Sequence, residues 1–129
     1  MPELKRILQV EDEEVIQGLV RMVLATKSIE VELASDLKQA LEALEGTNSY
    51  SGLFQYDALL LDMAFPGGNG ATVAKKARGL GYKGRIVMFS GVDMQEARKQ
   101  TQDLDNIGYL KKPLDIENFI PALEGTYSE

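Results

Sequence analysis

The chain has 129 residues, 44% of them hydrophobic, and a net charge of −6 from 14 basic and 20 acidic residues. This length is typical of one compact domain, and the hydrophobic fraction can supply its core without disulfides. The absence of cysteine excludes disulfides, thiolate metal sites and cysteine nucleophiles, and the absence of histidine excludes an imidazole base or a Ser-His-Asp triad. The acidic balance opposes binding to nucleic acid or to anionic membranes, because such partners attract Lys and Arg.

Five short runs of β-forming residues predict strands, and they alternate with longer stretches at helical spacing. The runs 58–61 and 86–89 are continuously apolar, as is typical of parallel strands that are buried on both faces. The run Ile29–Leu33 alternates apolar and charged residues, which predicts an edge strand. The other two predicted strands are 5–10 and 107–110.

Four helices are predicted by apolar residues that recur every three or four positions. We expect all members of these four stripes to face the core: Val15, Ile16, Leu19, Val20 and Val23; Leu37, Ala40, Leu41 and Leu44; Val73, Ala74, Ala77 and Leu80; Ile116, Phe119, Ile120 and Leu123. A fifth helix, Met94–Leu104, has a thinner apolar side. Ser35 is the expected N-cap of the second helix, and Gly46 is its expected C-terminal stop.

This strict alternation predicts an α/β fold, a doubly wound five-stranded parallel sheet with helices on both faces. Because the second strand has edge character and the first and third have central character, the favoured strand order is 2-1-3-4-5, the flavodoxin-like arrangement with five helices. In such a sheet, ligands bind beyond the carboxyl ends of the first and third strands.

Carboxylates are concentrated at those two strand ends. Glu11 and Asp12 follow the first strand, and Asp62 ends the third. Two like charges ~4 Å apart cost ~4 kcal/mol at an effective dielectric of about 20, so either one carboxyl is protonated or a cation lies among them. Oxygen ligands on strand ends suit Mg²⁺. Ser90 and Lys112 end the fourth and fifth strands, so the cleft is equipped to hold a phosphoryl group through a metal.

Two features are interpreted as structural only. Glu13 and Glu14 suit the first turn of a helix, where acidic residues offset the helix dipole. The polar stretch 46–56 is interpreted as a tolerated surface insertion in preference to a partner-specific loop, because long surface loops cost little free energy.

Four motifs at the strand ends resemble the receiver domain of two-component response regulators (CheY-like), along essentially the whole chain. The motifs are Ile7–Glu13, Leu60–Asp62 with Pro66 and Asn69-Gly70 behind it, Phe89–Gly91, and Tyr109–Pro113. Glu11 departs from the commonest pattern, which has Asp there, but it keeps the charge.

The resemblance implies a metal site and a phosphoacceptor. Asp62 matches the aspartate that accepts the phosphoryl group. Glu11 and Asp12 match the acidic pair that holds Mg²⁺, with Mn²⁺ as the alternative, helped by Asp62 and by the backbone carbonyl of Ala64.

The resemblance also implies a switch. Lys112 matches the lysine that pairs with the phosphoryl oxygens, and Ser90 matches the hydroxyl residue that binds the phosphoryl group and draws its loop inward. Tyr109 matches the aromatic residue that moves from exposed to buried with that loop. The Lys112–Pro113 peptide bond is typically cis in this family.

The implied function is that of a phosphoacceptor in a two-component phosphorelay, with Mg²⁺-dependent self-phosphorylation and slow autodephosphorylation but no enzymatic turnover. The donor would be a histidine kinase or a histidine phosphotransfer protein, because this chain has no histidine. A downstream protein is expected to bind the face built from the fourth helix, fifth strand and fifth helix, and a phosphorylation-dependent dimer is a further expectation.

We also expect one cytoplasmic domain over 1–129 with its core at about 4–124, no output domain and no contact with membrane or nucleic acid. No apolar run approaches the ~18 residues of a membrane span, and no signal-peptide core is present at the N-terminus.

Three rival functions fit less well, and a fourth stays open. A dinucleotide-binding domain would need its glycine fingerprint where Glu11–Glu13 stand, and a P-loop would need a Gly-Lys-Ser/Thr motif that is absent. An aspartate-based phosphohydrolase would need a second acid at Ala64. A pseudo-receiver, which keeps the fold and binds partners without phosphorylation, remains the second interpretation.

Overall fold

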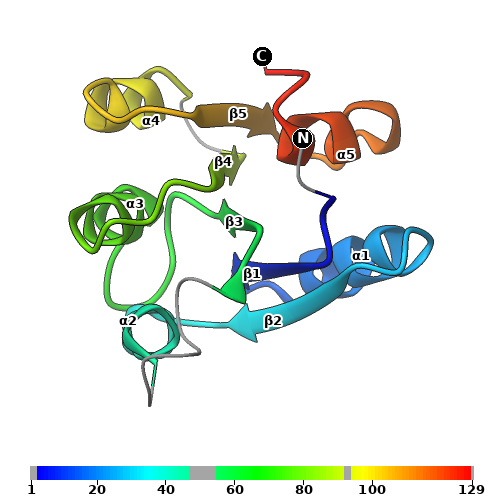
Figure 1. Cartoon of the computed structure of the whole chain (residues 1–129), viewed down its shortest axis with the longest axis horizontal. Helices are drawn as coiled ribbons and strands as arrows, with labels where there is room; N and C mark the ends of the chain where they lie inside the picture. The colour runs from blue at the N-terminus through cyan, green and yellow to red at the C-terminus, as the bar shows by residue number, and fades with distance from the viewer. Residues whose placement is uncertain (1–2, 47–54, 92–93, 129) are drawn as a thin grey trace.

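The computed structural model describes residues 3–46, 55–91 and 94–128, and within them five strands alternate with five helices (Figure 1). The strands are β1 (Arg6–Val10), β2 (Glu30–Ala34), β3 (Ala58–Leu61), β4 (Arg85–Ser90) and β5 (Ile107–Lys111). The helices are α1 (Glu14–Ala25), α2 (Leu37–Glu45), α3 (Gly70–Gly79), α4 (Met94–Thr101) and α5 (Ile116–Glu124). All strand pairs are parallel and the order is β2-β1-β3-β4-β5, so the predicted doubly wound fold is confirmed.

The sheet separates two hydrophobic cores. Helices α1 and α5 cover one face, and α2, α3 and α4 cover the other (Figure 1). Alternate residues of each strand enter opposite cores: Ile7 packs with α1 and α5, whereas Leu8 packs with α2 and α3. This burial on both faces explains the continuously apolar sequences of the central strands.

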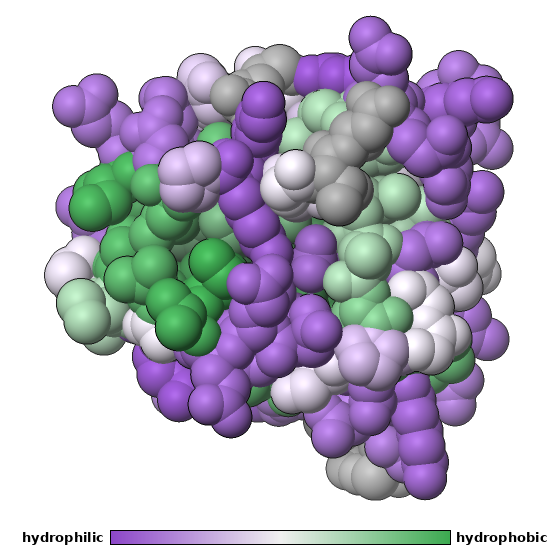
Figure 2. Space-filling model, turned by 180° about the vertical axis from the view of Figure 1, so that it is seen from behind, coloured by the Kyte–Doolittle hydropathy of each residue, from purple (hydrophilic) through white to green (hydrophobic). Residues whose placement is uncertain are grey.

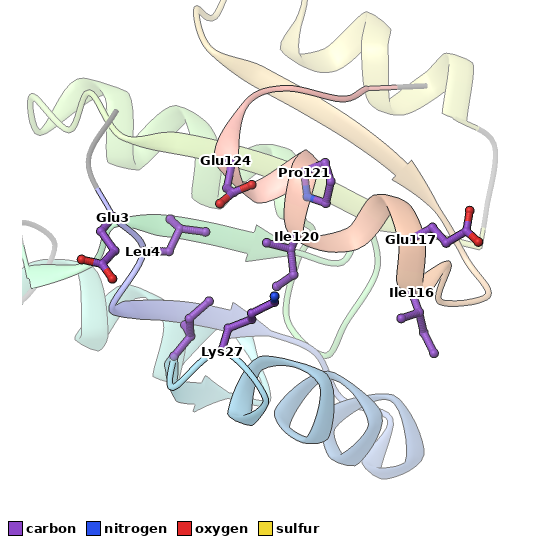
Figure 3. Close-up of a pocket in the computed structure, with 9 residues that line it drawn as sticks. Glu3, Leu4, Lys27, Ile116, Glu117, Ile120, Pro121 and Glu124 are labelled. Carbon is purple, nitrogen blue, oxygen red and sulfur yellow. The ribbon is translucent and has the colours of Figure 1, made fainter.

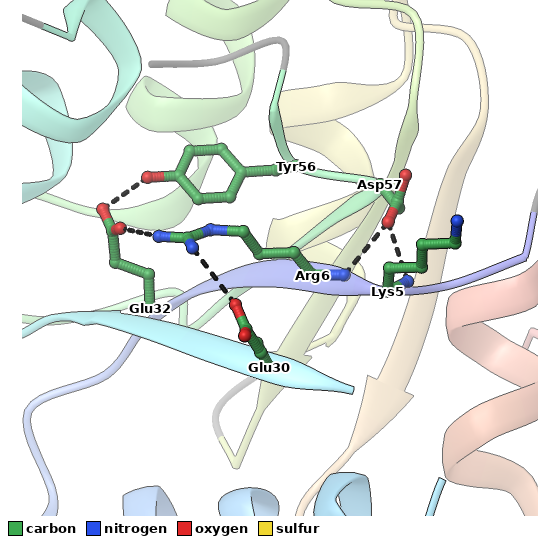
Figure 4. A network of polar contacts seen from close by, with 6 residues as sticks. All are labelled: Lys5, Arg6, Glu30, Glu32, Tyr56 and Asp57. Atoms are coloured by element: carbon green, nitrogen blue, oxygen red, sulfur yellow. Dashed lines mark hydrogen bonds and ion pairs between the residues drawn. The ribbon is translucent and has the colours of Figure 1, made fainter. Parts of the chain in front are cut away.

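The edge strand β2 is joined to β1 by a polar network near the amino ends of the strands (Figure 4). The Arg6 guanidinium contacts the carboxylates of Glu30 and Glu32, and the Tyr56 hydroxyl also donates to Glu32. Asp57 accepts the backbone N–H groups of Lys5 and Arg6 at 2.8 and 3.0 Å. The charged residues of the predicted edge strand therefore have partners on its neighbours, which anchors the edge.

The prediction that the whole apolar stripe of α1 faces the core is wrong. Val20 and Leu24 are fully buried, but Val15 is 75% exposed and Leu19 is 40% exposed. A helix resting on a sheet buries only one side, and residues 15 and 19 lie outside the side that contains 20 and 24. Two other predicted core residues, Leu80 and Ile116, are also exposed because they lie at helix ends.

Two helix boundaries differ from the predicted ones. Asp36, not Ser35, caps α2, because its carboxylate accepts the Gln39 N–H at 2.8 Å while the Gln39 side chain accepts the Ser35 N–H at 2.7 Å. Gly46 ends α2 with φ 66°, as predicted. Helix α4 ends at Thr101, earlier than predicted, although Leu104 still packs on the core. Within the 46–56 stretch, residues 47–54 lie outside the described residues.

No described helix is long and apolar enough to cross a membrane.

Gln9 is a buried polar side chain in β1, in register with Leu33 and Leu60, and both polar atoms of its amide lack a hydrogen-bond partner. Burying an unpaired amide costs about 1–3 kcal/mol. Gln9→Met keeps the side-chain length and removes that cost, so we expect the free energy of unfolding to rise by about 1–2 kcal/mol in urea denaturation. Gln17→Met is the matched control and should instead destabilise, because the Gln17 amide donates to the Glu11 carbonyl at 2.7 Å. An equal loss in both variants would contradict this account.

Candidate functional site

Three carboxylates meet at the carboxyl ends of β1 and β3. Parallel pairing aligns Val10 with Leu61, so the residues that follow these strands emerge side by side. Ligand oxygens of Glu11, Asp12 and Asp62 all lie within 4.8 Å of one another. Glu11 is 1% exposed and Asp62 is 7% exposed, whereas Asp12 is exposed to solvent. The structure thus brings together the three acids that the sequence placed at the switch point of the sheet.

Lys112 supplies positive charge to this cluster from the loop after β5. Its Nζ lies 2.8 Å from Glu11 Oε1, 3.5 Å from Asp62 Oδ2 and 3.7 Å from Glu13 Oε1. The Lys112 N–H donates to the Ser90 carbonyl at 2.9 Å, which holds the start of this loop against the end of β4. The following peptide bond, Lys112–Pro113, is cis.

Burial dominates the electrostatics of the two inner acids. Burial raises the pKa of Glu11, and the hydrogen bond from Lys112 opposes this without cancelling it. The pKa of Asp62 is also raised by burial, against the Lys112 charge and the backbone hydrogen bonds of Ala64 and Met63. Burial lowers the pKa of Lys112, but Glu11 and Asp62 outweigh burial and raise it overall. One ammonium group therefore faces two buried carboxylates and exposed Asp12, an arrangement that favours a further cation.

The chain around Glu11 explains why this carboxylate is held in place. Its Oε2 accepts the Glu13 N–H at 3.2 Å, and its backbone carbonyl accepts the Gln17 amide at 2.7 Å. The sequence pattern at Glu13 indicates only a helix N-terminal acid. Glu13 is indeed the N-cap residue of α1, but its side chain makes no capping bond and its carboxylate approaches Lys112 instead. The approach of Glu13 to Lys112 has no local sequence signal, because the two residues are distant in the chain.

Ser90 and Tyr109 lie on the neighbouring strands. Ser90 ends β4 and is fully buried. Tyr109 in β5 is 7% exposed, its hydroxyl shares a hydrogen bond with Thr101, and the Arg98 guanidinium carbon lies 4.3 Å from its ring centroid. No sequence pattern predicts these contacts of Arg98 and Thr101 with Tyr109, because they arise only when α4 packs against β5.

Gly70 brings the start of α3 close to Asp62. A Cβ at position 70 would lie 2.3 Å from the Asp62 carbonyl oxygen and 2.9 Å from the Met88 methyl group. Asn69 caps α3 by accepting the Thr72 N–H at 3.0 Å, and the Gly70 N–H donates to the Met63 carbonyl at 3.2 Å. The loop that carries the acid is therefore packed directly against a glycine.

Comparison with known proteins places the chain in a family. A family model of the response regulator receiver domain matches residues 7–124. The chain belongs to the response regulator receiver domain family. This domain is 30% identical over 118 residues to the transcriptional regulatory protein DltR of Streptococcus agalactiae, a match that covers 92% of this chain and 50% of DltR. The domain thus spans about half the length of that relative.

Solved structures agree on the fold. The CheY-like receiver domain protein of Methanospirillum hungatei superposes with a TM-score of 0.80 at 23% identity, covering 95% of this chain and 92% of that one. The response regulator TrrA of Thermotoga maritima, solved in complex with Mg²⁺-BeF, superposes with a TM-score of 0.77 at 23% identity and covers 96% of this chain and 100% of that one.

Proposed function

We propose that this receiver domain accepts a phosphoryl group on Asp62 from a phosphohistidine of another protein, and that the modification changes its binding to a downstream protein. The observation that carries the proposal is the position of Lys112 Nζ, 2.8 Å from Glu11 and 3.5 Å from Asp62, beside three carboxylates with oxygens within 4.8 Å. This geometry joins a carboxylate nucleophile to the positive charge that phosphoryl transfer requires.

The acidic cluster fits a hard divalent cation. It offers carboxylate oxygens from Glu11, Asp12 and Asp62, and exposure of Asp12 leaves room for the waters that Mg²⁺ retains. We propose these residues, with the Ala64 carbonyl, as the holders of Mg²⁺, or of Mn²⁺ in its place. When bound, the ion supplies positive charge to the phosphoryl oxygens. The Mg²⁺-BeF complex of TrrA supports this choice of metal.

Asp62 and Lys112 act on the phosphoryl group directly. An Asp62 oxygen forms a bond to phosphorus as the bond from phosphorus to the donor imidazole nitrogen breaks, and the nitrogen keeps the electron pair. Lys112 is positioned to neutralise the transferred oxygens, since its ammonium already lies within 3.5 Å of Asp62 Oδ2. The chain cannot donate to itself through histidine, because it has none.

The output side of the proposal rests on Ser90 and Tyr109. New negative charge on Asp62 would attract the Ser90 hydroxyl and move the loop that follows β4. Tyr109 is joined to α4 through Thr101 and Arg98, so a change at this loop alters the surface built from α4, β5 and α5. We propose this surface as the site for a downstream protein and for a phosphorylation-dependent dimer.

The test uses the whole chain, Mg²⁺ and acetyl phosphate, with intact mass as the readout. We expect one phosphoryl group on the wild type, none on Asp62→Asn, and none when Mg²⁺ is removed with EDTA. Asp36→Asn is the matched control, because Asp36 is not one of the three clustered acids and asparagine keeps the α2 cap. An adduct that persists in Asp62→Asn would overturn the proposal. A wild type without any adduct would favour the pseudo-receiver, and continuous release of phosphate would indicate a hydrolase.

A further inference from the structure

Helix α1 carries a second apolar stripe that the domain itself does not cover. Val15, Leu19 and Met22 are 75%, 40% and 67% exposed and follow one another at four- and three-residue spacing. Residues at this spacing lie on one side of a helix and are the positions that anchor a partner helix. A soluble surface rarely gathers several large apolar side chains in this way without a binding role.

The side of the molecule that carries α1 has further exposed apolar surface on α5. The large green area in the left half of Figure 2 lies on the side of these two helices. Ile116 at the start of α5 is 68% exposed. A groove of about 520 Å³ lies beside α5, with Ile120 and Pro121 of that helix on one side and Lys27, from the turn after α1, on the other (Figure 3).

Gly18 stands beside this stripe without a structural reason inside the domain. It lies in the middle of α1, is exposed, and a Cβ added to it would meet no atom within 4 Å. Glycine weakens the interior of a helix relative to alanine, so a monomeric α1 would be more stable with alanine there. A glycine is useful on an exposed helix face where the backbone of another helix approaches closely.

The charges on α1 indicate what that second helix is. The acidic residue Glu14 lies at the N-terminal end and the basic residue Arg21 lies two turns later, and neither forms an ion pair with another described residue. An antiparallel copy of α1, related by a two-fold axis near Gly18, sets Glu14 of one copy near Arg21 of the second copy. The same axis sets Val15 opposite Met22 and Gly18 close to Gly18. A parallel copy would instead set like charges together.

We propose that two copies of this chain associate through α1, packed antiparallel about a two-fold axis near Gly18. Gly18 lies at the centre of the contact, with the apolar stripe of Val15, Leu19 and Met22 on one side of it and the Glu14–Arg21 pairs on the other. This interface does not involve Asp62 and does not depend on phosphorylation, so it differs from the surface of α4, β5 and α5 proposed above.

The association is tested by sedimentation equilibrium of the unphosphorylated whole chain from ~5 μM to ~500 μM. The weight-average mass of the wild type should rise from 14.2 kDa towards twice that value. Met22→Glu changes an exposed side chain and should raise the dissociation constant at least ~10-fold. Leu80→Glu is the matched control, because Leu80 is also exposed but lies at the end of α3, and it should associate as the wild type does.

Charge-reversal and glycine variants test whether the partner is a second copy and whether it packs antiparallel. Glu14→Arg alone should weaken association, because it faces Arg21 of the second copy, and the double variant Glu14→Arg/Arg21→Glu should restore it. Gly18→Ala should raise the melting temperature of the dilute monomer by ~3 °C while weakening association, since its Cβ obstructs the contact. Gly79→Ala, also without atoms within 4 Å, should leave association unchanged.

The proposed dimer through α1 is overturned by any one of three results. A wild type that stays monomeric at every concentration overturns it, as does a dimer that Met22→Glu leaves intact or a charge reversal that fails to restore association. Asp62→Asn should associate like the wild type, so this test and the phosphorylation test fail independently.

Discussion

Lys112→Met should lower the free energy of unfolding at pH 7, without added metal, by about 2–4 kcal/mol. The substitution keeps the length of the side chain but removes the charge that lies 2.8 Å from Glu11 and 3.5 Å from Asp62. Both carboxylates are nearly inaccessible to water, so the substitution leaves two buried negative charges without the ammonium group that compensated them. The domain should remain folded, and phosphorylation by acetyl phosphate should be strongly reduced. Urea denaturation and intact mass measure the two effects.

The pH dependence of this loss follows from the raised pKa values. A carboxyl whose pKa is raised by folding holds its proton more tightly in the folded state. Its contribution to the free energy of unfolding is therefore fully present at a pH below its unfolded-state pKa and is lost as the pH rises through its folded-state pKa. Removing Lys112 raises the pKa of Glu11 and Asp62 further, because both are lowered by its charge. The deficit of Lys112→Met should therefore be largest near neutral pH and shrink as the pH falls through the carboxyl range.

Lys111→Met is the matched control, because it removes the same charge from the neighbouring residue, which is exposed. We expect less than ~0.5 kcal/mol of change there, as is usual for surface substitutions. A Lys112→Met domain that is as stable as the wild type and as easily phosphorylated would refute the role of this side chain.

The sequence predicted what depends on local pattern. Continuous apolar runs indicated buried strands, the alternation in Ile29–Leu33 indicated the edge position of β2, and the rule for parallel sheets then brought Glu11 and Asp62 together. These features were predictable because the direction of a strand and the edge at which it ends follow from element order alone.

Several contacts that the sequence did not predict depend on how separate elements pack. The apolar residues of α1 fit two different sides of a helix, and only docking on the sheet decides that Val20 is buried and Val15 is exposed. The approach of Glu13 to Lys112 and of Arg98 to Tyr109 likewise joins residues from different elements. No periodicity in a single segment reports such pairs.

The close contact between Gly70 and the backbone of Asp62 is another feature that depends on packing. The sequence motif places Asn69-Gly70 a few residues after Asp62 but does not show how closely the two approach in space. In the structure the space beside it is filled by backbone, since a Cβ would lie 2.3 Å from the Asp62 carbonyl oxygen and 3.1 Å from the Asp62 carbonyl carbon. A backbone atom that belongs to a buried strand end cannot rotate away as a flexible side chain can.

Gly70→Ala should therefore destabilise the domain by about 3 kcal/mol and displace the backbone of Asp62, so that phosphorylation by acetyl phosphate falls as well. Gly79→Ala, which adds the same methyl group to the same helix, meets no atom within 4 Å and should be neutral or slightly stabilising. Urea denaturation compares the two free energies, and NMR shifts of the Asp62 and Met63 amides report the displacement. Equal stability of the two variants would show that the contact between Gly70 and the Asp62 carbonyl does not hold the loop that carries Asp62 in place.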